Sequence, residues 1–155
     1  MTDSGYMRLA IALAEGAAAE GEVPVGAVVA DPDGNVIGTG RNRREAAGSA
    51  LAHAELEAIQ TACRAVGGWR LVDCTLYVTL EPCPMCAGAA INARIKRVVY
   101  GAADSKAGSC GSLVDLFELP YNHKPLLTAG VMAEECGALL SAFFAGLRKK
   151  EGIEV

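Results

Sequence analysis

The sequence predicts an α/β protein in which helices pack on one mixed sheet. Apolar residues recur at helical spacing in three long segments, and short β-branched apolar runs lie between these segments. A strand, a helix and a second strand follow one another over residues 75–101, which is long enough for a parallel pair with a right-handed crossover. Helices that alternate with strands in this way are typical of the α/β class.

Three long helices are predicted from apolar residues three or four positions apart. The first covers residues about 3–19, the second ends at Gly67-Gly68, and the third ends at Arg148-Lys149-Lys150, where cations suit a helix C-terminus. A shorter helix starts at Glu81-Pro82-Cys83-Pro84, because proline suits the first turn. The predicted buried stripes are Met7, Ile11, Ala14 and Ala18; Ala52, Leu56, Ile59, Cys63 and Val66; and Met132, Cys136, Leu139, Phe143 and Leu147.

Four strands are predicted, at Val25–Ala30, Asn35–Thr39, Thr75–Thr79 and Arg97–Gly101. The first two form a hairpin, since Asp31-Pro32-Asp33-Gly34 between them is a turn sequence. They supply the antiparallel part of the sheet, and the later two supply the parallel part. The Gly/Ser-rich segment 102–112 is too long for a plain turn and is therefore a candidate functional loop.

Composition restricts the class of protein. With 155 residues, 52% hydrophobic and 21% charged, the chain is expected to be a single globular domain over 1–155 and not a disordered segment. The longest uncharged stretches, at 82–93 and 136–147, have 12 residues each, which is too short for a membrane span. We expect no membrane partner and no secretory signal, because Asp3 opens the N-terminus and Glu15 interrupts its apolar run.

Cysteine usage and net charge restrict the partners. Six cysteines without a signal indicate a reducing compartment, so we expect a cytoplasmic protein. The net charge of −4 excludes a dedicated nucleic-acid coat, so any nucleic-acid binding depends on a local basic patch. The candidate cations are Arg41, Arg43, Arg44, Arg94, Lys96, Arg97, Lys106, Arg148, Lys149 and Lys150.

The most informative pattern is His53-Ala54-Glu55 followed, after 26 residues, by Pro82-Cys83-Pro84-Met85-Cys86. Two cysteines three positions apart at a helix start can reach one metal ion, and the helix N-terminus favours their thiolate forms. One histidine and two cysteines suit Zn²⁺ and leave its fourth position open, as in a catalytic zinc site. Water at such a site becomes acidic enough to act as hydroxide, and Glu55 is the candidate general base.

The relative placement of His53 and Glu55 stays open at this stage. Two residues apart on a helix means a rotation of roughly 200°, so both side chains can serve one site only if the helix begins between them. Two other interpretations of Cys83 and Cys86 also remain. They can form a redox pair, or they can belong to a structural zinc site with His123 as the fourth ligand.

The combined His-x-Glu and Pro-Cys-x-x-Cys signature is that of zinc nucleobase deaminases. Over nearly its whole length the chain resembles the bacterial tRNA-specific adenosine deaminases of the zinc cytidine/deoxycytidylate deaminase superfamily. The resemblance depends on segments 22–29, 40–42, 52–55, 75–89, 101–108, 111–116, 122–123 and 139–144. It implies a three-layer α/β/α cytidine-deaminase-like fold with one mixed sheet of roughly five strands, and a homodimer.

The resemblance also implies the reaction and the residues that perform it. Adenosine at the wobble position of a tRNA anticodon becomes inosine when a zinc-bound hydroxide attacks C6 and Glu55 shuttles the protons. The implied zinc ligands are His53, Cys83 and Cys86, with one Zn²⁺ per subunit. The tRNA anticodon stem-loop is the implied partner. The implied substrate-binding residues are Asn42, Ala54, Asp104, Lys106, Phe144 and Arg148.

Simpler interpretations stand beside these roles. Asn42 can be a turn residue, Asp104 can tighten its own loop, and Phe144 can belong to the core. The 148–150 cations can be a solvated helix end, and Cys63, Cys74, Cys110 and Cys136 can be small buried apolar residues. Two other functions share the zinc motif, namely a deaminase of free guanine, cytosine or a nucleoside, and a non-catalytic zinc-stabilised binding module.

Overall fold

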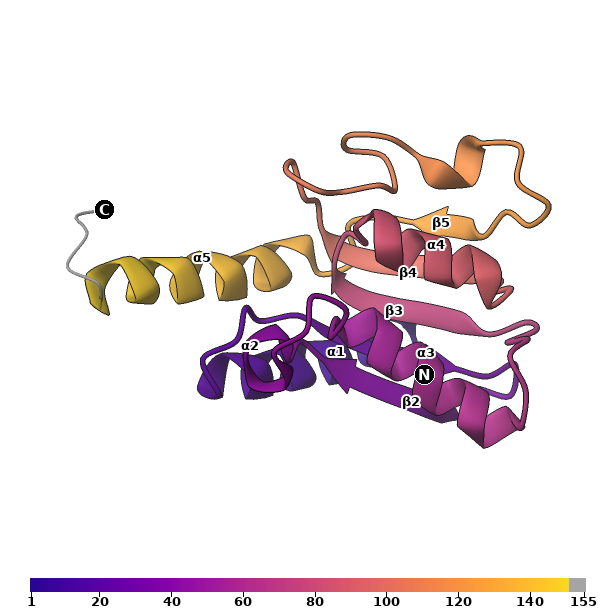
Figure 1. Cartoon of the computed structure of the whole chain (residues 1–155), viewed down its shortest axis with the longest axis horizontal. Coiled ribbons are helices and arrows are strands. Elements are labelled where there is room, and N and C mark those ends of the chain that lie inside the picture. Colours follow the sequence, from indigo (N-terminus) through magenta and orange to yellow (C-terminus); the bar gives the residue numbers. More distant parts are fainter. Residues whose placement is uncertain (151–155) are drawn as a thin grey trace.

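A mixed sheet of five strands forms the centre of the molecule (Figure 1). The computed structural model describes residues 1–150, so residues 151–155, where the expected domain ends, lie outside the described part. The spatial order of the strands is β2-β1-β3-β4-β5. Their bounds are β1 Gly26–Ala30, β2 Val36–Arg41, β3 Thr75–Leu80, β4 Arg97–Ala102 and β5 Leu126–Thr128.

The strand directions confirm the predicted division of the sheet. β1 pairs antiparallel with β2 and with β3, whereas β3, β4 and β5 run parallel to one another. β5 is not visible in the local sequence pattern, because it has three residues and none of them is fully buried. The fifth strand therefore came from the family resemblance alone.

Helices cover both faces of the sheet, which confirms the three-layer fold. On one face lie α3 (Ala54–Val66) and α4 (Pro84–Asn92), and their buried residues join β-strand residues such as Val29 and Leu76 in one core. On the other face lie α1 (Asp3–Ala19) and the start of α5 (Ala133–Lys150), which share a second core with Val28 and Val99. Alternate residues of β1 thus serve opposite cores.

The buried stripe of α3 differs from the predicted one. The residues that face the sheet are Ala54, Ala58 and Ala62, whereas Ala52 precedes the helix and Val66 is exposed. The reason lies in β2, where a Cβ on Gly38 or Gly40 would overlap the α3 backbone. The helix lies so close to the strand that only small side chains fit between them. Of the larger predicted residues, Ile59 is buried in the same core, whereas Leu56 and Cys63 are half-buried.

The other two predicted stripes are also only partly right. In α1 the buried residues include Tyr6, Ala10 and Ala17, while Ile11 and Ala18 are only half-buried. In α5 only Cys136 is buried, because the helix leaves the sheet after its first turns and its second half extends beyond the body of the molecule (Figure 1). No helix within residues 1–150 is both long and apolar enough to cross a bilayer.

Two short helices were not predicted. α2 (Arg44–Ala47) lies between β2 and α3, and η1 (Leu116–Glu118) lies between β4 and β5. Both belong to connections, so neither carries an apolar period that a sequence pattern could reveal. Of the four cysteines expected to be small core residues, Cys74, Cys110 and Cys136 are buried and Cys63 is half-buried.

Candidate active site

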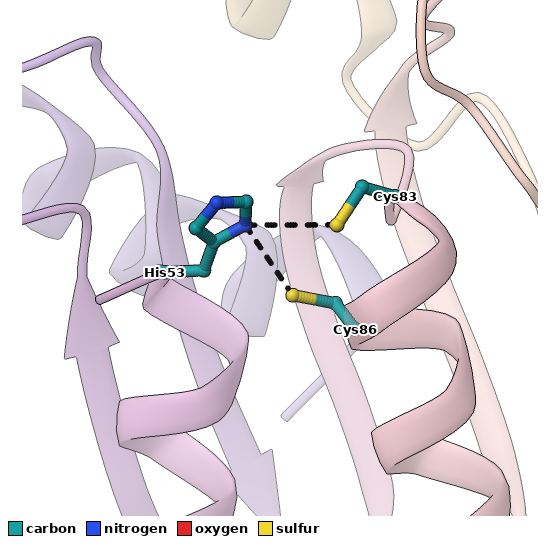
Figure 2. A group of neighbouring side chains, drawn as sticks. All are labelled: His53, Cys83 and Cys86. Atoms are coloured by element: carbon teal, nitrogen blue, oxygen red, sulfur yellow. Dashed lines mark hydrogen bonds between the residues drawn. The ribbon is translucent and has the colours of Figure 1, made fainter. Parts of the chain in front are cut away.

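Two helix N-termini meet on one side of the sheet and bring the predicted ligands together. His53 has extended backbone and immediately precedes α3, so the helix begins between His53 and Glu55. Cys83 precedes α4 in the same way, with Pro84 in the first turn and Cys86 two residues further on. None of these side chains caps its helix, and all three of His53, Cys83 and Cys86 turn toward one point (Figure 2).

The spacing of the three ligand atoms fits a zinc ion. His53 Nδ1 lies 3.7 Å from Cys83 Sγ and 3.5 Å from Cys86 Sγ, and all three atoms lie within 4.8 Å of one another. A nitrogen and a sulfur ligand on one tetrahedral zinc lie roughly 3.6 Å apart, given bond lengths of about 2.0–2.1 and 2.3 Å. The group therefore needs no rearrangement to hold the ion.

The electrostatics of the group favour a thiolate. A hydrogen bond from Cys86, opposed by burial and helped by His53, lowers the pKa of Cys83 to about 4. The pKa of His53 is raised by the hydrogen bond between His53 and Cys83. The pKa of Cys86 is raised by its own hydrogen bond with Cys83 and by burial. One thiolate is thus already present at neutral pH, in the form that binds metal.

Glu55 lies in the first turn of α3 and is 4% exposed. Burial raises the pKa of its carboxyl to about 7, although the positive charge of His53 acts in the opposite direction. A carboxyl group with a pKa near neutrality can both accept and donate a proton during a reaction. This is the property that the sequence analysis expected of Glu55 as a general base.

A cavity of about 400 Å³ opens above these residues. His53, Glu55 and Cys83 lie in its wall, whereas Cys86 lies beneath it and is fully buried. Five of the six residues expected to bind substrate also line this cavity, and Arg148 does not. The five are Asn42, Ala54, Asp104, Lys106 and Phe144.

Asn42 lies in one wall of the cavity with its side chain held by the backbone. Its Nδ2 donates to the Val23 carbonyl at 3.1 Å, and its Oδ1 accepts from the Arg44 amide at 3.2 Å. Both the turn role and a place beside the substrate are therefore compatible with its position. The same segment is fixed by the buried Glu22, whose carboxylate accepts from the amides of Glu45 and Ala46 at 3.0 and 2.8 Å.

The loop after β4 forms the opposite wall. Asp104 Oδ1 accepts from the amides of Lys106 and Ala107 at 2.9 and 3.3 Å, which confirms that this carboxylate tightens its own loop. Glu81 lies behind the loop. Burial acts to raise the pKa of Glu81, but hydrogen bonds from Ser112, Asp104 and Cys110 outweigh it and hold this pKa below the ordinary value.

α5 contributes an aromatic side chain at the rim. Phe144 is 39% exposed and packs edge-on against Phe143, with ring centroids 5.5 Å apart. It is a rim residue, so the core interpretation is wrong, while its contact with substrate stays a prediction. Arg148 lies one turn further along the helix, outside the cavity wall.

The geometry decides one of the two alternatives left for the cysteines, namely the structural zinc site with His123. His123 Nε2 donates to the Ile95 carbonyl at 2.7 Å, so this side chain is engaged away from Cys83 and Cys86. Among residues 1–150, His53, Cys83 and Cys86 form the group able to hold a metal, and His123 is not part of it. A closed structural site with His123 as fourth ligand is therefore wrong.

Four of the ten candidate cations form ion pairs with carboxylates. Arg41, Arg43, Lys96 and Arg97 form ion pairs with Glu20, Glu57, Asp73 and Asp3. Arg44 and Lys106 line the cavity instead, and neither forms an ion pair within the described part of the chain. The local positive charge at the site thus comes from two residues on opposite walls.

Sequence reasoning missed several residues of the site. The wall also contains Val23, Val25, Leu80, Glu81, Ala103, Ser105, Ala107 and Leu140. Glu81 offered one signal, since a glutamate at the end of an apolar strand and next to a metal-ligand motif is unusual on an inward face. The others are small or apolar residues whose role depends on how the chain folds.

Comparisons with known proteins agree with this geometry. The sequence pattern of the cytidine and deoxycytidylate deaminase zinc-binding region matches residues 1–102. The chain is 50% identical over 150 residues to the tRNA-specific adenosine deaminase of Bacillus subtilis, covering 96% of this chain and 92% of the relative.

Two solved structures share the fold. A structure from work on A-to-I editing by tRNA:A34 deaminases at the wobble position superposes with a TM-score of 0.84 at 43% identity, over 88% of this chain and 99% of that one. A guanine deaminase from Bacillus subtilis superposes with a TM-score of 0.65 at 33% identity, over 96% of this chain and 95% of that chain. The chain therefore belongs to the zinc-binding cytidine and deoxycytidylate deaminase family, and within it to the tRNA-specific adenosine deaminases.

Proposed function

We propose that this protein hydrolyses the exocyclic amine of adenosine at the wobble position of a tRNA anticodon and produces inosine and ammonia. The observation that carries the proposal is the convergence of His53, Cys83, Cys86 and the buried Glu55 at one cavity. The relatives described above support adenosine in tRNA as the substrate.

In this proposal His53, Cys83 and Cys86 hold one zinc ion in each subunit. A zinc ion with these ligands supplies Lewis acidity that makes water nucleophilic near neutral pH. Glu55 takes a proton from the attacking water and delivers a proton to N1 of the adenine ring. It then takes the remaining proton from the new C6 hydroxyl group and passes it to the amino group, so that the C6–N bond breaks, ammonia leaves and C6 becomes a carbonyl.

The cavity walls hold the nucleotide. Asn42, Ala54 and Asp104 lie where the base enters, and Phe144 offers an exposed ring on which a neighbouring base can stack. Lys106 lies on one wall and Arg44 on the other, where they can contact phosphates, and Arg148 extends this contact along α5.

The anticodon stem-loop is the proposed binding partner. Bases of an anticodon loop are unpaired, so turning one into the cavity costs little energy. Such a target compensates for the small number of free cations at the site.

We place the reaction in the cytoplasm and assign residues 1–155 to one domain.

A homodimer is also proposed. Five large apolar side chains between residues 113 and 126 are exposed, and we take the segment that holds them as the interface. These residues are Leu113, Val114, Leu119, Tyr121 and Leu126. Light scattering after size exclusion tests this point, since we expect a mass near twice 16.0 kDa, and a monomer would contradict it.

The experiment that tests the function compares substrates. Zinc-loaded protein is incubated with an anticodon stem-loop that carries adenosine at the wobble position, and separately with guanine, cytosine, adenosine and cytidine. We expect inosine and ammonia from the RNA alone. Turnover of guanine with no reaction on RNA would assign the protein to the activity named for the Bacillus subtilis guanine deaminase, which shares the fold.

A further inference from the structure

Glu81 is a buried carboxylate at the end of β3 that the proposed reaction does not use. It is 2% exposed, and the next residue but one is Cys83. No lysine or arginine of the described residues forms an ion pair with it. A buried carboxylate without a cation needs other partners, because an unsatisfied buried charge is strongly destabilising.

Its partners all come from the loop after β4. Oε1 accepts from the Asp104 amide at 3.0 Å and from the Ser112 hydroxyl, while Oε2 accepts from the amides of Cys110 and Ser112, both at 3.0 Å. Three of these four donors are backbone amides, which can only donate. Both oxygens of Glu81 must therefore be acceptors.

The loop closes around Glu81 without spare volume. A Cβ on Gly108 would overlap both the Glu81 carboxyl carbon and the Asp104 carbonyl. The Gly108 amide donates to that same carbonyl at 2.9 Å, and the Ser109 amide donates to the Pro82 carbonyl at 2.9 Å. The shape of the loop is thus set by Glu81 and by the residue that follows it.

The same loop forms a wall of the cavity. Residues 103–107 line it, including Asp104 and Lys106, and Glu81 itself reaches its inner surface. One end of the Glu81 network therefore lies at the substrate wall, and the other end lies in the segment that leads to Cys83. A change at Glu81 would therefore move this wall. It would leave the metal-binding residues in place, because the starts of α3 and α4 position them.

We propose that Glu81 is a positioning residue that holds loop 103–112 in the shape that binds RNA. It acts on substrate affinity through Asp104 and Lys106, and not on the chemical step. This inference rests on the proposed function, because it assumes an RNA substrate at this wall.

The first test is Glu81→Gln in the full-length, zinc-loaded protein. A glutamine offers one oxygen and one NH₂ group, and the NH₂ group would face at least one backbone amide. We expect KM for the anticodon stem-loop to rise about 10-fold while kcat stays within about 2-fold. Zinc content measured by mass spectrometry is expected to stay at one ion per subunit.

Two further variants separate the loop contact from the charge. Ser112→Ala removes only the hydroxyl donor, so we expect KM to rise about 3-fold. Gly108→Ala keeps the Glu81 charge but pushes the loop away, and we expect it to reproduce the rise in KM of Glu81→Gln. Gly68→Ala is the matched control, since a Cβ there meets nothing within 4 Å, and KM should not change.

The outcomes distinguish this inference from the proposed function. If the unaltered protein does not act on RNA, the proposed function fails. If it does act, a fall in kcat with unchanged KM in Glu81→Gln would overturn the positioning role, as would loss of zinc. If Glu81→Gln does not fold, Ser112→Ala and Gly108→Ala decide, and an unchanged KM in both would overturn the proposal.

Discussion

At the scale of single residues, Glu55 combines the two properties that a proton shuttle needs. It is buried beside the metal-binding group, and burial raises its pKa to about 7. Neither property depends on a hydrogen bond to a substrate. Both follow from the start of α3 at Ala54, because His53 precedes the first turn and Glu55 lies within it, and the two side chains reach the same cavity.

We expect Glu55→Gln to lower kcat for inosine formation by about 10²–10⁴-fold, because the amide cannot carry the proton. Zinc should remain bound, since His53, Cys83 and Cys86 are unchanged. Metal analysis and a single-turnover assay measure the two effects. Retained activity, or loss of the metal, would contradict the role given to Glu55. Glu15→Gln, at an exposed position of α1, is the control.

The metal-binding residues could be predicted from the sequence, whereas the partners and the role of Glu81 could not. His53, Cys83 and Cys86 are recognisable because their residue types and spacing match the demands of one ion. The role of Glu81 depends on Asp104, Cys110 and Ser112, which are 23 to 31 positions away and meet it only in the folded chain. No local pattern records such contacts.

At the scale of elements, the close approach of α3 to β2 sets the position of His53. The sequence predicted the helix, but of its predicted stripe only Ile59 is buried, because apolar size is a poor guide where two backbones nearly touch. Gly38 and Gly40 leave room for Ala54, Ala58 and Ala62, and for nothing larger. The packing distance therefore decides which face of α3 is buried.

We expect Gly40→Ala to reduce the free energy of unfolding by about 1–3 kcal/mol, as overpacking does. Its Cβ would overlap the Ala54 carbonyl, so α3 and His53 must shift and zinc affinity should fall. Urea unfolding and competition with a chelator measure these changes. Gly137→Ala in α5 serves as the control, because no atom lies within 4 Å of its Cβ. A Gly40→Ala variant with unchanged unfolding free energy and unchanged zinc affinity would contradict this packing argument.

Another element-scale contact attaches α1 to the sheet. Asp3 accepts two hydrogen bonds from Arg97, at 2.8 and 3.0 Å, and one from the Tyr77 hydroxyl at 3.0 Å. The hydrogen bond with Arg97 is the main cause that lowers the pKa of Asp3, against a smaller opposing effect of burial. The ion pair therefore stabilises the fold at pH values above the pKa of Asp3 in the unfolded chain, about 3.9. This stabilisation is lost as the pH falls through the lower pKa that Asp3 has in the folded protein.

We expect Asp3→Asn to cost about 1 kcal/mol of unfolding free energy or less at pH 7, because the pair is partly exposed and screened by solvent. The difference from the unaltered protein should shrink as the pH falls below about 4. Urea unfolding at several pH values measures it. The variant Asp33→Asn in the β1–β2 turn is the control, and a difference that grows in acid would contradict the ion-pair argument.

At the scale of the whole molecule, the parts of the site lie together at the end of the sheet where β3 and β4 finish. The starts of α3 and α4 bring the metal-binding residues, while segment 42–53 and loop 103–112 form the two walls. Two buried carboxylates, Glu22 and Glu81, each hold one wall through backbone amides. The helices on the sheet thus place the metal-binding residues, and the connections between elements form the cavity walls.

Mapping inosine along intact tRNA tests whether this cavity deaminates adenosine at the wobble position. A pool of unmodified tRNA is treated with the zinc-loaded protein or with Glu55→Gln, and inosine is read by sequencing. We expect inosine at the wobble position with the unaltered protein and none with Glu55→Gln. Inosine at other positions, or the same inosine positions after treatment with Glu55→Gln, would contradict this activity.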